Sequence, residues 1–173
     1  LMINTMKEPL NDKRFRRALA TAIDYNALRQ FAVSNYTSTL KAGLIMPTDL
    51  EGKYIVDEDL EKYGVNLGIS DEAERLAAVK QILSEAGFKS VFNDDGTLDH
   101  MENAKGERLP TLYITSPNGW TDWEAMVTIA VEGMRKAGID IREGFVDGGS
   151  YWPAMGLGNF DLVMHKPVAD VTP

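Results

Sequence analysis

The stretch LYITSPNGWTDWEAMVTIAVEGMRKAGIDI, residues 112–141, predicts a strand, a loop, a helix and the start of a second strand. Its first four residues are apolar and β-prone, which is typical of a short buried strand. Apolar residues then recur at helical spacing over 122–137, and Gly138 stands where that helix is expected to end. The stretch therefore predicts a β-α-β unit with parallel strands.

Residues outside this unit extend it into a larger domain of the α/β class. We expect strands at 110–116, 139–146 and 160–166, a short helix around 151–157, and a further strand of the same sheet at 1–6. The order β-α-β-α-β favours a mainly parallel sheet with right-handed crossover helices.

Caps and turns divide the rest of the chain. Asn11 and Ser70 are the expected N-caps of two helices, and Gly87 is the expected end of the second. Thr121 with Glu124 three residues later fits a capping box. The run at 93–96, Asn-Asp-Asp-Gly, predicts a hairpin turn.

Composition excludes several classes of protein. The chain of 173 residues, 44% hydrophobic and 25% charged, is typical of one globular domain. Its net charge of -8 argues against nucleic acid and anionic membranes as partners. It has no cysteine, so disulfides, thiolate zinc sites and a cysteine nucleophile are excluded. No apolar run is long enough to predict direct insertion of this segment into a membrane.

Metal and cofactor sites are not expected. The two histidines, His100 and His165, lack a partner at ligand spacing. The turn at 93–96 half resembles a calcium loop, but the first ligand position falls on Val91, which has no side-chain oxygen. No glycine-rich phosphate loop follows a predicted strand.

We expect no enzyme activity, because no serine of the sequence stands in a nucleophile-elbow motif. A glycosidase pair of carboxylates remains open as an alternative. Asp122 and Glu124 are more simply explained as acids in the first turn of a helix.

Three loops leave the carboxyl ends of predicted strands, at 116–123, 147–152 and 165–168. In open α/β sheets such loops line the ligand crevice. The candidate ligand-binding residues on them are aromatic, polar or cationic: Asn118, Trp120, Trp123, Asp147, Trp152, His165 and Lys166.

Two tryptophans in one loop favour a platform for something flat, such as a sugar ring. The alternative is that one of them closes the loop over the core. Aromatic faces with hydrogen-bonding groups suit a neutral polyhydroxy ligand.

Four segments of the chain resemble the extracellular solute-binding proteins of family 5, the dipeptide- and oligopeptide-binding type that serves ABC importers. The first, at 10–24, is similar to the family's nDxRvRqAlxyAiD segment. The others, at 83–88, 133–141 and 159–162, are similar to its LLaeAGy, lkkiGIdV and gdFD segments.

This resemblance implies that residues 1–173 are a single three-layer α/β lobe of a clamshell of the periplasmic-binding-protein type II. The other lobe would come from chain before Leu1 and after Pro173, with a hinge at both ends. The resemblance further implies a periplasmic or extracellular location, association with the membrane through the parent protein or its permease, a monomeric state, and delivery of a ligand to an ABC permease.

The expected ligand follows from one difference from the family's peptide binders and one similarity to its oligosaccharide binders. Peptide binders of the family carry an aspartate four residues before a proline; with Pro173 as that proline, the position is Ala169. The run at 119–123 instead resembles the oligosaccharide-binding members, whose ligands are cello- or manno-oligosaccharides. An oligopeptide binder is the alternative, and a glycoside hydrolase fragment is a more distant one.

Overall fold

The computed structural model describes residues 1–37, 52–58 and 68–166. Its elements are β1 (Met2–Ile3), α1 (Lys13–Ala22), α2 (Tyr25–Ala27), η1 (Leu28–Ala32), η2 (Gly52–Tyr54), α4 (Glu72–Ala86), β2 (Lys89–Phe92), β3 (Leu98–Glu102), β4 (Leu112–Pro117), α5 (Thr121–Lys136), β5 (Ile141–Val146), α6 (Gly148–Leu157) and β6 (Leu162–Val163). Three predicted features lie outside the described residues: the expected hinge at the C-terminal end, Ala169, and the second half of the loop at 165–168.

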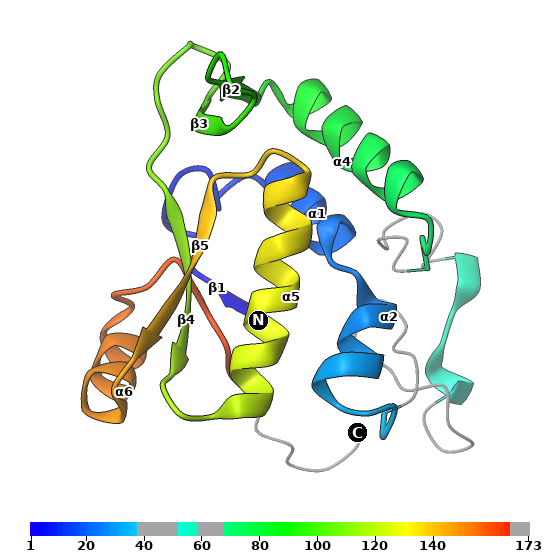
Figure 1. Cartoon of the computed structure of the whole chain (residues 1–173), viewed down its shortest axis with the longest axis vertical. Coiled ribbons are helices and arrows are strands. Elements are labelled where there is room, and N and C mark those ends of the chain that lie inside the picture. The colour runs from blue at the N-terminus through cyan, green and yellow to red at the C-terminus, as the bar shows by residue number, and fades with distance from the viewer. Residues whose placement is uncertain (38–51, 59–67, 167–173) are drawn as a thin grey trace.

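The main sheet has the strand order β1-β6-β4-β5 (Figure 1). β4 runs parallel to both β5 and β6, and β1 pairs antiparallel with β6. The pairing of β4 with β5 extends over six residues, from Leu112 opposite Ile141 to Pro117 opposite Val146. The predicted α/β class and mainly parallel sheet are confirmed.

Two predicted strands are much shorter than expected. The strand at 1–6 pairs only at Met2 and Ile3, and the strand at 160–166 pairs with its neighbours only at 162–163. Asn4 explains the first limit, because its side-chain amide donates to the carbonyls of Gly158 and Phe160 at 3.0 Å each. That contact holds the chain against the loop before β6, and residues 5–8 then form turns.

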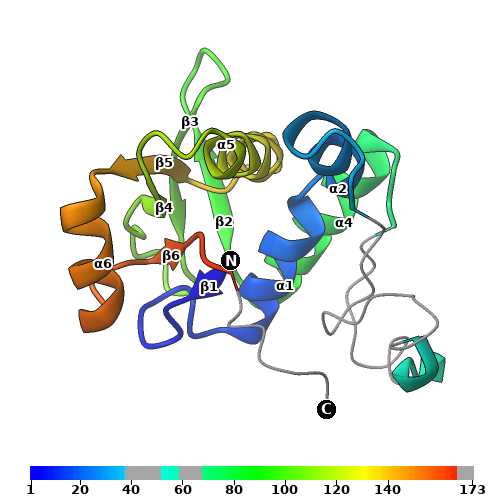
Figure 2. The same cartoon turned by 90° about the horizontal axis from the view of Figure 1, so that it is seen from below.

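Helices lie on both faces of the sheet, which gives three layers (Figure 2). α1 and α5 lie on one face, α4 packs on the outer side of α1, and α6 lies on the other face. β2 and β3 form a separate hairpin, as the turn at 93–96 predicts. No helix of the described ranges is both long and apolar enough to cross a membrane.

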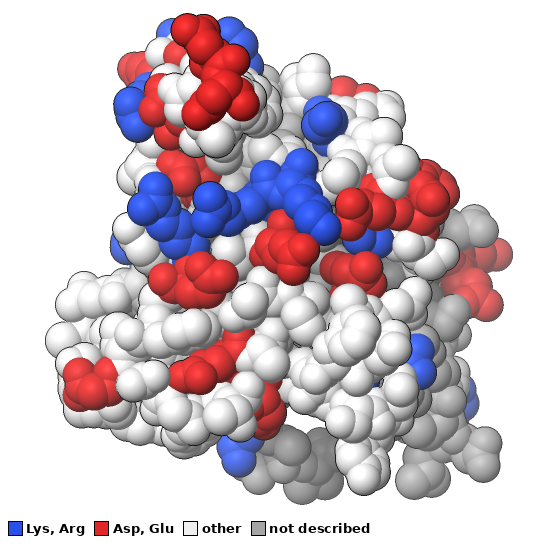
Figure 3. Space-filling view, in the orientation of Figure 1, with Lys and Arg blue, Asp and Glu red and all other residues white. Residues whose placement is uncertain are grey.

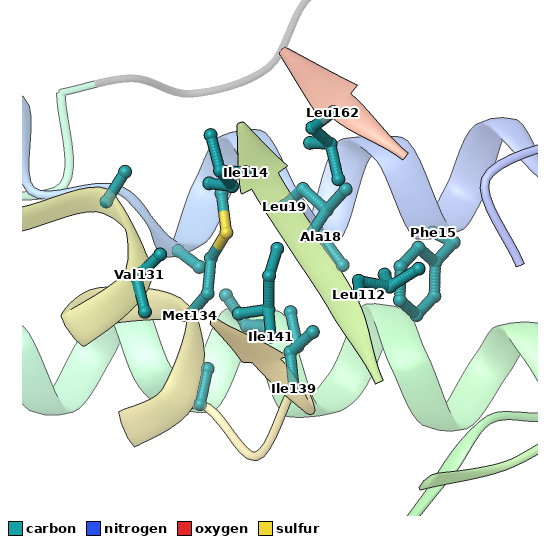
Figure 4. Close-up of a cluster of buried hydrophobic side chains, with 14 of the residues drawn as sticks. Phe15, Ala18, Leu19, Leu112, Ile114, Val131, Met134, Ile139, Ile141 and Leu162 are labelled. Atoms are coloured by element: carbon teal, nitrogen blue, oxygen red, sulfur yellow. The ribbon is translucent and has the colours of Figure 1, made fainter. Parts of the chain in front are cut away.

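The core fills the space between the sheet and α1, α4 and α5. Its aliphatic and aromatic side chains come from facing positions of these elements (Figure 4). The labelled members are Phe15, Ala18, Leu19, Leu112, Ile114, Val131, Met134, Ile139, Ile141 and Leu162. α5 approaches the end of α1 so closely that a Cβ atom on Gly133 would lie 2.3 Å from the carbonyl oxygen of Ala22.

Two predicted N-caps are wrong by one residue. Asp12 caps α1 and Asp71 caps α4, in place of Asn11 and Ser70. The carboxylate of Asp71 accepts a hydrogen bond from the backbone N–H of Glu74 at 2.8 Å. Both members of each sequence pair are good caps, so propensity alone does not choose between them. Gly87 ends α4 in the left-handed conformation with φ of 85°, as predicted.

Candidate functional site

The loop after β4 exposes a pair of tryptophans. The rings of Trp120 and Trp123 meet edge to face, with centroids 4.7 Å apart and planes inclined by 65°. Trp120 retains 44% of its accessible surface, whereas Trp123 is partly buried on the first turn of α5. The contact follows from their three-residue spacing at the start of a helix.

The predicted capping box between Thr121 and Glu124 is wrong, because Glu124 bonds to a different residue. Thr121 is already the first residue of α5, and the N-cap is Trp120, whose side chain makes no capping hydrogen bond. The carboxylate of Glu124 still reaches back, but it accepts from the backbone N–H of Gly119 at 2.7 Å. This contact fixes the loop just before Trp120 and gives Glu124 a structural role.

The loops after β4 and β5 are tied together. The backbone N–H of Asn118 donates to the carbonyl of Val146 at 2.7 Å, and the Asn118 side chain is exposed. Asp147, the next residue, caps α6: its carboxylate accepts from the backbone N–H of Ser150 at 3.0 Å and from the Ser150 hydroxyl at 2.7 Å. These hydrogen bonds lower the pKa of Asp147 below its usual value.

A second aromatic group lies on α6. Trp152 retains 47% of its surface, and its ring packs edge to face against Tyr151 and, with centroids 6.2 Å apart, against His165. Tyr151 is fully buried and its hydroxyl donates to the carbonyl of Met164. Tyr151 thus connects α6 to the chain that leaves β6 and supports the Trp152–His165 contact.

His165 and Lys166 follow β6. The Nδ1 atom of His165 is buried and has no hydrogen-bond partner within the described ranges. Lys166 is exposed and stands at the last described position. The backbone N–H of Met164 donates to the carbonyl of Thr115 at 2.8 Å, which places this segment beside β4.

The structure therefore groups the predicted residues into two sets on one edge of the sheet. Trp120 and Trp123 belong to α5, and Trp152 with His165 belongs to the α6 side, so the two sets lie on opposite faces (Figure 2). Asn118 and Asp147 lie between them at neighbouring strand ends. Sequence reasoning missed Phe145, which is exposed opposite Ser116 at the end of β5.

Charge is unevenly distributed over the molecule. In Figure 3 acidic side chains gather on the hairpin at the top, a band of basic side chains with acidic neighbours crosses the middle, and the lower part is mostly white with separate acidic groups. That lower part covers α6 and the N-terminal end of α5. Within the described ranges no group of His, Asp or Glu side chains could hold a metal ion.

The sequence model of the bacterial extracellular solute-binding proteins, family 5 (middle part), matches residues 1–173. The chain belongs to this family. Members of the family are binding proteins, and 57 solved chains resemble this family 5 chain. None of the curated proteins matches it.

A periplasmic oligopeptide-binding protein of an oligopeptide ABC transporter from Thermotoga maritima is 32% identical to the family 5 chain, with a TM-score of 0.79. A mannohexaose-bound structure of the same Thermotoga protein gives 33% identity and a TM-score of 0.78. In both comparisons 94% of the family 5 chain is covered, and it spans only 28% of the length of the relative.

The oligopeptide-binding protein AppA from Bacillus subtilis, solved in complex with a nonapeptide, is more distant. It is 23% identical to the family 5 chain, with a TM-score of 0.64, and the match covers 92% of this chain and 29% of AppA. This likeness shows a shared fold.

Proposed function

We propose that this chain is the substrate-binding lobe of a solute-binding protein that captures cello- or manno-oligosaccharides for import by an ABC permease. The observation that carries the proposal is the contacting pair of Trp120, which is exposed, and Trp123, which is partly buried, at the carboxyl edge of β4. Aromatic rings that pack against each other and keep part of their surface in solvent are suited to stack on the apolar face of a sugar ring. The exposed amide of Asn118 supplies a donor and an acceptor for sugar hydroxyls.

One further observation supports a sugar ligand. The Thermotoga relative with a mannohexaose-bound structure is among the more similar solved structures, at 33% identity.

An oligopeptide is the second candidate ligand, because the same Thermotoga relative is described as an oligopeptide-binding protein. Extended peptides bind through backbone hydrogen bonds and side-chain pockets, which require paired donors and acceptors rather than flat aromatic faces. A glycoside hydrolase remains the distant alternative, and it is weakened by the structural use of Glu124 in its bond to Gly119.

The proposal includes a place and a partner. The protein would act in the periplasm or at the outer cell surface, and it would deliver its ligand to a membrane permease as a monomer. The ligand would lie between this lobe and a second one, joined to it by a hinge. The isolated 173-residue chain should therefore bind weakly, since each sugar ring would keep one side in water.

Calorimetric titration of the intact protein that carries this chain tests the proposal. The panel consists of cello- and manno-oligosaccharides and of uncharged oligopeptides of matched length, with chromatography of each sugar after the titration. Heat of binding with a sugar and unchanged sugar afterwards supports the proposal. Heat with peptides alone would establish the second candidate, and released monosaccharide would establish an enzyme.

A further inference from the structure

Two aromatic side chains that the sequence analysis did not single out are exposed in η1 and in the corner of chain that follows it, residues 33–37. Phe31 keeps 70% and Tyr36 keeps 92% of its accessible surface. One exposed aromatic residue is ordinary in a soluble protein. Two such rings here stand within six residues of each other in the sequence.

The backbone of this corner is held in an unusual conformation. Ser34 and Asn35 have φ of 49° and 61°, in the left-handed region that residues other than glycine rarely adopt. The backbone N–H of Asn35 donates to the carbonyl of Arg29 at 2.7 Å, and that of Tyr36 donates to the carbonyl of Val33 at 2.9 Å. Strained conformations of this kind persist where the surroundings fix them, and they gather at ligand-binding sites.

The corner follows a segment that packs on the same helix as the tryptophan pair. η1 packs against α5, and Figure 1 shows the α2–η1 segment beside the half of α5 that begins at Thr121. Seen from below in Figure 2, α6, α5 and the α2–η1 segment follow one another across the molecule. Trp152 is separated from Trp120 by the sheet, whereas η1 and α5 lie on the same side of it.

We propose that Phe31 and Tyr36 form an outer subsite for the sugar units of a longer oligosaccharide that extend beyond Trp120 and Trp123. This inference rests on the proposed function. Two rings whose centroids are 4.7 Å apart can contact only a short part of such a ligand. A ligand that continues toward η1 stays on one side of the sheet and meets further exposed aromatic faces, and the Tyr36 hydroxyl adds a hydrogen-bonding group.

The test is a chain-length series on the intact protein. Affinities for manno- and cello-oligosaccharides from the disaccharide to the hexasaccharide are measured for the unchanged protein and for the Phe31→Ala/Tyr36→Ala double variant. We expect the variant to bind the hexasaccharide about tenfold more weakly and the disaccharide with nearly unchanged affinity. Because both side chains are exposed, its melting temperature should stay near that of the unchanged protein.

Tyr54→Ala is the matched control, since Tyr54 is another exposed tyrosine and lies on η2. It should change the affinity at no chain length. Unchanged hexasaccharide affinity in the double variant would overturn the subsite while the proposed function stands. An equal loss at every chain length would also overturn it, because it would indicate a general structural effect. If the unchanged protein binds no oligosaccharide, the proposed function itself fails.

Discussion

The beginning of α5 and the rest of this helix have different environments. Along the rest of the helix, Val127, Val131 and Met134 are buried against the sheet and α1. At the beginning, Trp120 and Trp123 leave ring surface in solvent although tryptophan contributes more apolar area than any of these residues. The core thus contains the smaller side chains of α5, whereas the largest rings at its start keep surface available for a ligand.

The largest effect on the buried side of this comparison is expected for Met134→Ala. Met134 is fully buried between α5 and the sheet, and its removal leaves a cavity that the packed neighbours fill only in part. The free energy of unfolding should fall by about 2–5 kcal/mol, measured by urea denaturation. Sugar affinity of the folded fraction should not change. A loss below about 1 kcal/mol would mean that this face of α5 is not the core that we describe.

The next effect concerns the exposed side. Trp120→Ala should lower the sugar affinity of the intact protein by about 2 kcal/mol or more, the size expected for an aromatic hot spot. Its free energy of unfolding should change by less than about 1 kcal/mol. Calorimetry and thermal melting provide the two values. A stability loss of about 3–5 kcal/mol with unchanged affinity would place Trp120 in the core instead.

Substitutions at two glycines test the packing of α5 with a smaller expected change in the free energy of unfolding. Gly133→Ala should destabilise the protein by about 1–3 kcal/mol, because its Cβ would lie 2.3 Å from a backbone carbonyl oxygen that is fixed in α1. Gly156→Ala in α6 is the matched control: no atom lies within 4 Å of its Cβ position. That change should raise stability by up to about 1 kcal/mol. Equal effects of the two would refute the close contact of α5 with α1.

The smallest expected effect is a pH dependence in the body of the domain. Burial raises the pKa of Tyr25 to about 12. A raised pKa in the folded state means that stability is complete below the unfolded value near 10 and is lost as the pH rises toward 12. The loss between pH 10 and 11 should be roughly 1 kcal/mol greater for the unchanged protein than for Tyr25→Phe. Parallel pH profiles of the two in chemical denaturation would contradict the burial of Tyr25.

Sequence periodicity predicted the body of the domain because β4, α5 and β5 are local elements with clear apolar patterns. It predicted β1 and β6 to be longer than they are. The limit of β1 depends on hydrogen bonds from Asn4 to the carbonyls of Gly158 and Phe160, which are far from Asn4 in sequence. Caps were misplaced by one residue where two capping residues stand side by side.

The candidate site shows the same division. The predicted end of the strand was sufficient to place Trp120 and Trp123 after β4. Their three-residue spacing permits the contact that the structure shows. The contact of Trp152 with His165 depends on where β6 enters the sheet, which local patterns do not specify. The corner after η1 could not be predicted, because Ser34 and Asn35 give no glycine signal for a left-handed backbone.

The most direct test of the central claim is a crystal structure of the intact protein with a bound manno- or cello-oligosaccharide. We predict that one sugar ring lies parallel to the exposed face of Trp120, with carbon atoms about 4 Å from the indole ring. The account would be contradicted if the sugar made no contact with Trp120 or Trp123 and the exposed face of Trp120 were covered by another part of the protein.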